Sequence, residues 1–571
     1  MPASRPFSPY PFEPERHPSR MPPLEHGDEV QRHAVVVVGG GPVGFCAAIG
    51  LAQQGVPVVL LEADESVCFG SRAICLSRRS LQILQRLGAL PTFLQHGLAW
   101  TGGRAYYRGE QVLHFTMPRE DEQKLPAMIN LAQYRIEQNL LERAQALAPL
   151  IDIRWQTRVS GLRANEDGVE LIARTATGAY RLFTDWVVAA DGGRSFVRET
   201  LGLKLQGTRY GGRNLIVDIR MKSQRPAELL TYFDPPCNPG STVQVHKQPD
   251  DVWRIEYQLR EGEAADDAIL PENVLPRVQS LLNMMGETAA WAPIWTGQYQ
   301  ASALTLDRYG HGRVLLAGDA AHLMPNFGVR GANSGIDDAD NLAWKLALVV
   351  RGAASSRLLD SYSQERVAAA QENLAYGCKS TEFMAPPDFA FDLMRTAVLG
   401  LAARHPGLRP LISPRRGSTV CYNDSPLNAW PERSAAFAGG PEPGEVLPEC
   451  PITLADGRRG YVTDWFTGGF TVLWFTDAGP TPGNLLAWAD ECSQRGVRCA
   501  AFGLAQTSST GADASDDTGR LFGLYGAQPG SLLLVRPDGH LLARWLDVPL
   551  PVALAEASAA MQALLQPEGR V

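Results

Sequence analysis

A glycine-rich turn between a short apolar run and a helical segment constrains the fold of this chain most strongly. Residues 34–38 are one alanine and four valines, a pattern typical of a parallel strand that is buried on both faces. Gly39, Gly41 and Gly44 follow with the spacing G-x-G-x-x-G, and residues 42–54 are predicted to form a helix. Such a turn lets the backbone approach a pyrophosphate, which the free N–H groups of the helix N-terminus then bind.

A second apolar run supports a dinucleotide-binding interpretation. A strand is predicted over residues 56–61, and Glu62 follows at its end. This is about the place where a dinucleotide fold carries the acid that binds a ribose. The alternative is a glycine-rich turn with an unrelated surface glutamate. Because strand, helix and acid occur in the expected order, we prefer the dinucleotide site. The expected cofactor contacts in this region are Gly39, Gly41, Pro42, Gly44 and Glu62.

Two further motifs follow in the order that one long ligand requires. The first is D-G-G-R-S-F-V-R from Asp191, directly after an apolar run at residues 186–190. The second is G-D-A-A-H from Gly318, which leads on to Pro325. With the glycine-rich turn, these motifs divide a ligand into its pyrophosphate, its middle and a ribityl-flavin end. The three motifs together indicate a protein that binds FAD.

On these three motifs the chain resembles the class A flavin-dependent aromatic hydroxylases, which share the p-hydroxybenzoate hydroxylase fold. The resemblance covers residues 34–380 and extends more loosely to the C-terminus. It is closest to the subgroup that contains 3-(3-hydroxyphenyl)propionate hydroxylase, pentachlorophenol monooxygenase and phenol hydroxylase. The resemblance implies an α/β fold with a Rossmann-like FAD-binding domain, an inserted β-sheet substrate domain and a thioredoxin-like C-terminal domain.

Changes in composition along the chain predict its domain organisation. Residues 1–33 are rich in proline and charge and predict an extended arm, unless Phe7, Tyr10 and Phe12 pin it to the body. Period-two alternation within residues 208–305 favours a half-exposed sheet. We assign residues 1–33 to the arm, 34–207 to the first part of the FAD-binding domain, 208–305 to the substrate domain, 306–405 to the second part of the FAD-binding domain with a helical linker, and 406–571 to the C-terminal domain.

The C-terminal region is predicted to be redox-inactive. A proline- and glycine-rich passage at residues 439–444 precedes a predicted strand at 470–475 and a predicted hairpin at 531–539. Cys492 and Cys499 are not spaced as a C-x-x-C pair and lie outside a strand-to-helix turn. We therefore expect a structural or interface domain. The nine scattered cysteines and the lack of a signal peptide indicate reduced thiols in the cytoplasm.

The composition argues against several classes of function. A formal net charge of -8 over 571 residues supplies no basic face for the phosphates of a nucleic acid. The chain contains no stretch that approaches the roughly 18 uncharged apolar residues needed to span a bilayer, and its sequence shows no metal-binding cluster. We expect a cytoplasmic protein whose partners are a small aromatic substrate and O2. The sequence leaves the oligomeric state open, a homodimer included.

The resemblance implies further contacts to the cofactor. Arg72 would reach the pyrophosphate, Gln133 would contact the ribityl side, and the carboxylate of Asp319 would accept hydrogen bonds from ribityl hydroxyls. The alternatives are a surface salt bridge for Arg72 and an ordinary helix cap for Gln133. N–H groups near Ala332 and Asn333 would face the part of the flavin that becomes negative on reduction. The other expected cofactor contacts are Val159, Asp191, Gly192, Gly318 and Gly331.

The loop after the third motif departs from the commonest family pattern. It precedes a helix predicted over residues 336–350, and the resemblance implies that Pro325 shapes the cavity where the flavin C4a-hydroperoxide forms. Val329 and Arg330 stand where Gly-Gln is usual, and Ala332 stands where Met is usual. Arg330 is either a contact for a substrate anion or a solvated loop charge.

The substrate contacts are expected on the alternating strands of residues 208–305. Tyr232 and His246 are the preferred candidates, because a hydrogen-bonding tyrosine or histidine would help a phenol to lose its proton. With Pro325, they form the expected catalytic set. Arg254 and Tyr257 are further candidates for substrate binding. Packing within the sheet or exposure to solvent is the alternative for these side chains.

The resemblance implies a single-component monooxygenase. NADPH or NADH would reduce FAD, O2 would form the C4a-hydroperoxide, and one oxygen atom would be added to a phenolic ring. An alternative on the same scaffold is epoxidation, oxidative dehalogenation or another oxygenation of a non-phenolic molecule, since a fold does not fix its substrate. A non-catalytic, FAD-containing scaffold protein ranks last, because the motifs for the flavin end of the ligand are all present.

Overall fold

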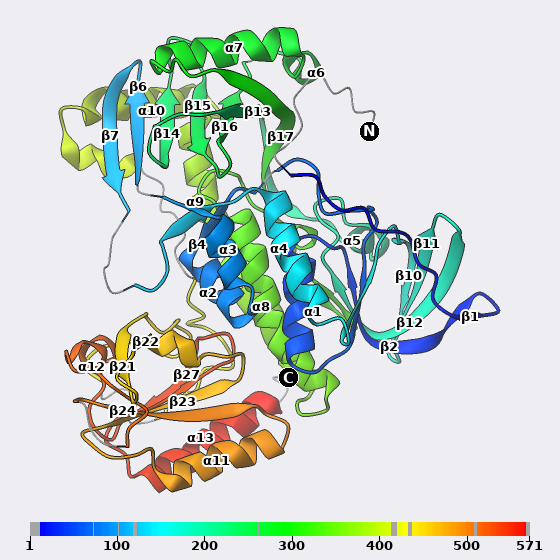
Figure 1. Cartoon of the computed structure of the whole chain (residues 1–571), viewed down its shortest axis with the longest axis vertical. Helices are drawn as coiled ribbons and strands as arrows, with labels where there is room; N and C mark the ends of the chain where they lie inside the picture. Colours follow the sequence, from blue (N-terminus) through cyan, green and yellow to red (C-terminus); the bar gives the residue numbers. More distant parts are fainter. Residues whose placement is uncertain are drawn as a thin grey trace.

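The computed structural model describes residues 12–71, 73–100, 102–117, 123–260, 262–412, 420–431, 437–507 and 511–566. Figure 1 shows a central body, an upper body whose strands lie below a long helix, and a lower body formed by the C-terminal part of the chain. Each body has its own sheet, of nine, eight and seven strands respectively. Within the described residues, no helix is both long enough and apolar enough to cross a membrane.

The central body is built on parallel strands. β2 (Asp28–Val38) lies between β3 (Val58–Leu61) and β12 (Gly178–Ala189), and β9 (Ile151–Arg154) and β19 (Val314–Leu316) continue the parallel pairing on either side. The valines of β2 that precede the glycine turn are buried, as the apolar run predicted. The sheet is completed by β1 (Leu24–Glu25), β10 (Arg158–Ala164), β11 (Val169–Thr175) and β18 (Gly310–His311).

Helices cover the central sheet and meet through small residues. α1 (Pro42–Gln53) packs along α8 (Gly331–Val350), and a methyl group added at Gly50 would lie 2.8 Å from the Cβ of Ala343. This close approach makes α1 and α8 one rigid pair whose N-termini both lie beside cofactor motifs. The other helices of this region are α2 (Arg78–Arg86), α3 (Leu90–His96), α4 (Gln133–Gln145), α5 (Phe196–Thr200) and α9 (Leu358–Met384), and a small sheet of β4 (Cys75–Ser77), β5 (Leu98–Ala99) and β8 (Met128–Asn130) lies beside them.

The N-terminal arm is tied to the central body. The ring of Phe12 stacks on Tyr134 with a centroid distance of 5.3 Å, and His17 stacks on Trp155 at 4.6 Å. Phe12 therefore pins the arm to the body, as the alternative interpretation expected, whereas Phe7 and Tyr10 lie outside the described residues. The arm is also shorter than the sequence suggested, since β2 begins six residues before Ala34 and pairs with β12.

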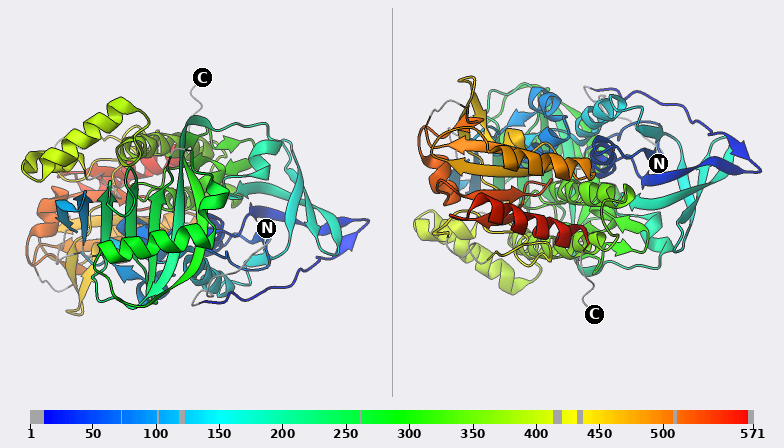
Figure 2. Two further views of the ribbon diagram at one scale, coloured as in Figure 1. Left: turned by 90° about the horizontal axis from the view of Figure 1, so that it is seen from above. Right: turned by 90° about the horizontal axis from the view of Figure 1, so that it is seen from below.

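The upper body is an antiparallel sheet with one parallel addition. β13 (Gln206–Met221) and β17 (Trp291–Thr305) are its longest strands, and β6 (Gly102–Tyr107) pairs in parallel with β14 (Glu228–Phe233). β6 and β7, which pair with each other, come from the region that the sequence assigned to the FAD-binding domain. α7 (Pro271–Met284) lies across one face of this sheet (Figure 2, left). The remaining elements are β7 (Glu110–Thr116), β15 (Thr242–Lys247), β16 (Val252–Gln258), β20 (His322–Leu323), α6 (Ala265–Ala268) and α10 (Phe389–Ala402).

The lower body is a mixed sheet with helices on both sides. β23 (Phe470–Thr476) pairs in parallel with β24 (Cys499–Ala505) and antiparallel with β26 (Leu532–Val535), which forms the predicted hairpin with β27 (Leu541–Trp545). The other elements are β21 (Pro451–Leu454), β22 (Arg459–Tyr461), β25 (Ala514–Ser515), α11 (Gly483–Gln494), α12 (Arg520–Tyr525) and α13 (Leu550–Leu565). The apolar core on the α11 and α13 side also includes Trp344 and Leu348 of α8.

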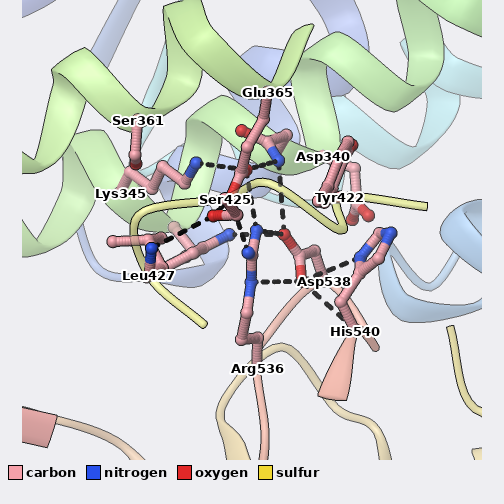
Figure 3. A network of polar contacts seen from close by, with 12 residues as sticks. Asp340, Lys345, Ser361, Glu365, Tyr422, Ser425, Leu427, Arg536, Asp538 and His540 are labelled. Carbon is pink, nitrogen blue, oxygen red and sulfur yellow. Dashed lines mark hydrogen bonds and ion pairs between the residues drawn. The ribbon is translucent and has the colours of Figure 1, made fainter. Parts of the chain in front are cut away.

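Charged side chains at the turn of this hairpin form a cluster with residues of α8 and α9 in the central body (Figure 3). The guanidinium of Arg536 donates to both carboxylate oxygens of Glu365 on α9, at 2.7 and 2.9 Å, and also to Asp538, at 2.6 Å. Lys345 of α8 donates to Glu365 at 2.7 Å, and the indole N–H of Trp344 donates to Asp538 at 3.1 Å. The four charged side chains, Lys345, Glu365, Arg536 and Asp538, are at most 1% exposed. The C-terminal domain therefore holds α8 and α9 through ion pairs shielded from water.

The two cysteines of α11 and β24 lie closer than their sequence spacing suggested. The hydroxyl of Ser493 accepts from the backbone N–H of Cys499 and donates to its carbonyl, both at 3.1 Å. A hydrogen bond from the Cys499 thiol lowers the pKa of Cys492. The turn between α11 and β24 thus brings two thiols together without a C-x-x-C motif.

Candidate FAD and substrate site

The glycine turn after β2 separates two structural glycines from one that faces open space. Gly39 has a φ of +103°, and a methyl group added to it would lie 2.5 Å from the carbonyl oxygen of Ala190. A methyl group on Gly44 would lie 1.9 Å from the carbonyl oxygen of Gly39. Gly41, the N-cap residue of α1, would meet nothing within 4 Å. The backbone therefore leaves room at the positive end of α1, where a pyrophosphate binds in this type of turn.

Glu62 lies beside this turn at the end of β3. Its carboxylate accepts hydrogen bonds from the backbone N–H of Gly40 at 2.5 Å and of Asp64 at 2.7 Å. Burial raises the pKa of Glu62, and the two backbone donors oppose that change. The acid is thus held next to the glycine turn, which is the arrangement expected for an acceptor of ribose hydroxyls.

The carboxylate of Asp191 orders the second motif. It accepts from the hydroxyl of Ser195 at 2.5 Å and from the backbone N–H of Val197 at 3.0 Å, at the start of α5. Gly192 has a φ of +79°, which favours glycine, and an added methyl group would meet no atom within 4 Å. The motif therefore uses Asp191 to fix its own loop and leaves open space beside Gly192.

A carboxylate of α8 holds the third motif in place. Asp338 accepts from the backbone N–H of Gly318 at 2.9 Å, from His322 at 2.7 Å and from Arg366 at 2.6 Å. Burial acts to raise the pKa of Asp338, but His322 and Arg366 lower it to about 2. His322 is fully buried, so it has a structural role in this loop. Asp319 lies on the exposed side of the 3₁₀ turn that Gly318 begins.

The N-terminus of α8 is anchored by the side chain of Asn333. Its amide oxygen accepts from the backbone N–H of Ser77 at 2.9 Å and from the hydroxyl of Ser80 at 2.6 Å, and its amide nitrogen donates to the carbonyl of Val329 at 2.8 Å. Gly331 and Ala332 are half-buried in the first turn of the helix, whose N–H groups have no acceptor within the helix itself. The helix begins five residues earlier than the sequence predicted.

The loop before α8 has an unusual backbone conformation. Val329 has a φ of +60°, a left-handed conformation that costs a β-branched residue about 1–3 kcal/mol. A glycine is usual here in the resembled family, and it would adopt this conformation freely. Arg330 is buried, donates to Asn373 and lies 5.0 Å over the ring of Tyr376. The interpretation of Arg330 as a solvated loop charge is therefore wrong. Its contacts with Asn373 and Tyr376 of α9 stabilise its charge, so no substrate anion is needed to explain it.

Gln133 braces the loop that follows β3. Its amide oxygen accepts from the backbone N–H of Ala73 at 3.3 Å, and its amide nitrogen donates to Glu137 at 2.9 Å. Glu137 accepts in turn from the backbone N–H of Cys68 at 2.6 Å, and burial raises the pKa of Glu137 to about 7. Arg72, in the same loop, lies outside the described residues. Its contact with the cofactor stays a prediction.

Val159 and Pro325 are both buried. Val159 lies in β10 next to a register shift, where it pairs with Ala173. Pro325 lies against α9, since a methyl group added at Gly377 would be 3.1 Å from its ring. The contact of Val159 with the cofactor and the shaping of the cavity by Pro325 stay predictions.

The eight-stranded sheet has two faces, and they divide the predicted substrate contacts. Tyr232 and Tyr257 lie on the face that packs against α7, within its apolar core. Tyr232 stacks on Tyr106 at a centroid distance of 4.9 Å, and the guanidinium of Arg277 lies 5.4 Å over Tyr257. Side chains alternate between the faces of a strand, so both tyrosines point away from the FAD-binding loops. We therefore no longer propose Tyr232 or Tyr257 as substrate contacts, nor Tyr232 as a catalytic residue.

His246 and Arg254 lie on the opposite face, toward the central body. His246 is buried, and the edge of its ring meets Trp100 at a centroid distance of 5.8 Å. Arg254 is buried, donates to both carboxylate oxygens of Asp218 at 2.8 Å, and donates to the carbonyl of Ser71 at 2.6 Å. Arg254 thus joins the sheet to the loop after β3. His246 remains a candidate substrate contact, whereas the contacts of Arg254 account for it as an anchor.

The comparisons with known proteins agree with this arrangement. The family described as FAD binding domain matches residues 32–376, which is more than half of the chain. The chain belongs to this family. The 3-(3-hydroxy-phenyl)propionate/3-hydroxycinnamic acid hydroxylase of Escherichia coli strain K12 is 27% identical over 564 residues, which cover 97% of this chain and 98% of the relative.

Solved structures show the same fold. The flavin-dependent monooxygenase PieE, in complex with FAD and substrate, has a TM-score of 0.76 and 23% identity, and the match covers 94% of this chain and 99% of that one. Aklavinone-11 hydroxylase, in a ternary complex with FAD and aklavinone, has a TM-score of 0.74 and 24% identity over 94% and 100% of the two chains. The family match confirms the predicted FAD cofactor, and the likeness to these structures confirms the predicted α/β fold.

The residues of this FAD-binding protein fit the cofactor. The open space at Gly41 lies at the N-terminus of α1, the acid of Glu62 lies beside it, and Asp319 is exposed after the third motif. We expect them to hold the pyrophosphate, a ribose and the ribityl chain respectively. The N–H groups at Gly331 and Ala332 would face the flavin ring.

Sequence reasoning missed Tyr299 and its pairing with Glu256 on the face toward the central body. The phenol of Tyr299 on β17 donates to the carboxylate of Glu256 on β16, at 3.2 Å. Glu256 lies two residues after Arg254 on β16, so the alternation of the sequence already predicts that the two side chains share a face. Tyr299 lies on a different strand, and only the pairing of both strands with β13 brings it beside Glu256.

Proposed function

We propose that this protein is an NAD(P)H-dependent, FAD-containing monooxygenase that hydroxylates a phenolic ring. The observation that carries the proposal is the polar face of the eight-stranded sheet, which reaches the loops around the cofactor motifs. Arg254 bonds to the carbonyl of Ser71 after β3, and β17 pairs with β20, where the third motif ends at His322. The curated relative named a hydroxylase, which is similar over nearly the whole chain, supports the same activity.

The cofactor supplies the chemistry of electron transfer and oxygen activation when it is bound. The chain binds and orients it through the N-terminus of α1 and through Asp319. The positive end of α8 at Gly331 and Ala332 would stabilise negative charge on the flavin ring. NADPH or NADH would reach the same flavin transiently.

The sheet face positions the substrate and keeps water away from it. His246 would contact the ring or its hydroxyl group, while Pro325 would shape the adjoining wall. Trp100, which meets His246 edge-on, contributes an apolar surface with Ile74 and Leu229. An apolar wall with few polar groups is the usual lining of a site for a small aromatic molecule.

A panel of phenols tests the proposal directly. We would measure oxidation of NADH and of NADPH by the FAD-loaded protein, with and without each phenol, and the mass of each product. The panel should include 3-(3-hydroxyphenyl)propionate, the substrate in the relative's name. The expected result is a phenol that stimulates NAD(P)H oxidation and gains one oxygen atom. If no phenol does so while a non-phenolic compound is oxygenated, the alternative reaction on this scaffold replaces the proposal.

A further inference from the structure

Glu256 and Tyr299 form a hydrogen-bonded pair on the polar face of the eight-stranded sheet. Glu256 pairs across the backbone with Ile216 of β13, and Tyr299 pairs with Asn214 two residues away on the same strand. This diagonal register allows the hydroxyl of Tyr299 to donate to Glu256 Oε2 at 3.2 Å. Both side chains are half-buried, whereas the neighbouring pair of Arg254 and Asp218 is almost completely buried.

The pair faces the loops that carry the cofactor motifs. Arg254, two residues before Glu256 and on the same face, bonds to the carbonyl of Ser71 in the loop after β3. Tyr299 interacts with Asn326, which directly follows Pro325 in the loop before α8. Glu256 and Tyr299 therefore lie at the boundary between the sheet and the central body, where the proposed function requires the substrate.

We propose that Tyr299 and Glu256 are the proton-accepting pair for the hydroxyl group of the substrate. This inference rests on the proposed function. The substrate O–H donates to Tyr299 Oη, and the O–H of Tyr299 donates to Glu256. In one step the substrate O–H bond breaks and a proton moves to Tyr299 Oη, while the original proton of Tyr299 moves to the carboxylate. Phenol and carboxylate become phenolate and carboxylic acid, so charge and protons balance.

The surrounding charges determine which member of the pair holds the proton. Burial raises the pKa of Glu256; Arg254 and the hydrogen bond from Tyr299 lower it, and Asp218 raises it. Burial and Glu256 raise the pKa of Tyr299 well above its ordinary value, against smaller opposite effects of Asn326 and Arg254. Tyr299 therefore stays neutral and passes a proton, and Glu256 is the group whose ionisation sets the pH dependence.

The test compares Glu256→Gln and Tyr299→Phe with a matched control, Tyr106→Phe, which removes a hydroxyl from the α7 face of the same sheet. For each FAD-loaded variant we would measure kcat/KM for an active phenol from about pH 5 to about pH 10. This range covers the titration of a carboxyl group with a raised pKa and of a phenol. We would also measure FAD content, melting temperature, and phenol affinity from the flavin absorbance. These three measurements separate a damaged fold or a lost substrate site from a lost proton acceptor.

The wild-type kcat/KM should rise as the pH passes the pKa of Glu256, because the carboxylate must be ionised to accept a proton. In Glu256→Gln this limb should disappear, with a loss of roughly 10²-fold or more near pH 7 and recovery as the phenol itself ionises near pH 10, about its ordinary pKa. Tyr299→Phe should behave similarly, and Tyr106→Phe should match the wild type.

Two outcomes would overturn the inference. If a phenol is hydroxylated and Glu256→Gln keeps the wild-type pH profile, the pair has no role in proton transfer, although the proposed function stands. If no phenol stimulates the wild-type enzyme, the proposed function fails and the inference fails with it. Loss of FAD or of stability in Glu256→Gln alone would leave the decision to the pH profile of Tyr299→Phe.

Discussion

The central body meets its two neighbours through interfaces of different character. Toward the C-terminal domain it presents Glu365 and Lys345, which are fully paired and at most 1% exposed. Toward the eight-stranded sheet it meets Glu256 and Tyr299, which are half-buried and joined by one hydrogen bond. The charges of the first interface are neutralised within the protein, whereas the second has, beside the buried ion pair of Arg254 and Asp218, two half-buried polar groups with capacity for another partner.

This difference indicates which interface fixes the structure and which serves chemistry. A buried carboxylate with several donors has a pKa far below its ordinary value, as Asp538 has through Arg536 and His540 despite its burial. Such a group is locked in one charge state. Glu256 has a raised pKa, and its hydrogen bond comes from the neutral hydroxyl of Tyr299, so it gains a proton more readily than Asp538 does. Proton transfer requires the second kind of group.

Asp538→Ala should have the largest effect. It leaves Arg536 buried with one partner fewer, and breaking a buried ion pair costs about 3–5 kcal/mol. We expect this loss in the free energy of unfolding, measured by urea denaturation and melting temperature. Asp456→Ala is the control, because its ion pair with Arg458 is exposed and should contribute at most about 1 kcal/mol. Equal stability of the two variants would contradict the assignment of the buried cluster as the fixed interface.

Gly41→Val should follow in size and should act on the cofactor. Its side chain would occupy the open space at the N-terminus of α1 and displace backbone hydrogen bonds to phosphate, which we expect to weaken FAD binding about 100-fold, or about 2.7 kcal/mol. The melting temperature of the FAD-free protein should stay unchanged. Gly44→Val is the contrast, since it collides with Gly39 and should prevent folding. Normal flavin content in Gly41→Val would exclude the proposed pyrophosphate site.

His246→Ala should have a smaller effect, confined to the substrate. Loss of one hydrogen bond of about 1 kcal/mol corresponds to a roughly fivefold rise in KM, together with release of H2O2 as NAD(P)H oxidation becomes uncoupled from hydroxylation. Tyr232→Phe, on the α7 face, should change neither value. A larger change in Tyr232→Phe than in His246→Ala would reverse our assignment of the two faces.

Replacing both Cys492 and Cys499 by serine should have the smallest effect. The two thiols interact with each other, but they lie in the C-terminal domain, away from the motifs that bind FAD. Hydroxylation turnover and coupling should remain at the wild-type values under reducing conditions. A large loss of turnover in a folded, FAD-loaded double variant would give the C-terminal domain a redox role.

The cofactor motifs were predictable from the sequence because their requirements are local. Gly44 is needed by its contact with Gly39 within one strand–turn–helix unit, Gly39 has a positive φ that favours glycine, and Glu62 directly follows the next strand. The alternation within β16 also separates Tyr257 from Arg254 and Glu256. The alternation does not reveal which of the two sets of side chains faces the flavin, because that depends on where α7 packs.

The rest depended on contacts between distant segments. Arg536 and Glu365 are 171 positions apart, and neither stands in a recognisable motif. The pairing of Tyr299 with Glu256 needs the register of three strands. The left-handed conformation of Val329 was also hidden, since a valine in the sequence predicts extended structure. The burial of Arg330 in the same loop was hidden as well, and it excludes one of the two interpretations left open, the solvated loop charge.

The charged cluster of the C-terminal hairpin has a consequence for the order in which the chain folds during synthesis. Lys345 and Glu365 emerge from the ribosome long before Arg536 and Asp538, and their pairing with each other leaves Glu365 without its bidentate partner. Domains generally fold from the N-terminus as they are made. In this protein the ion pairs and hydrogen bonds that join α8 and α9 to the hairpin form only after translation is nearly complete, and we expect a truncated product lacking the hairpin to be degraded by cellular proteases.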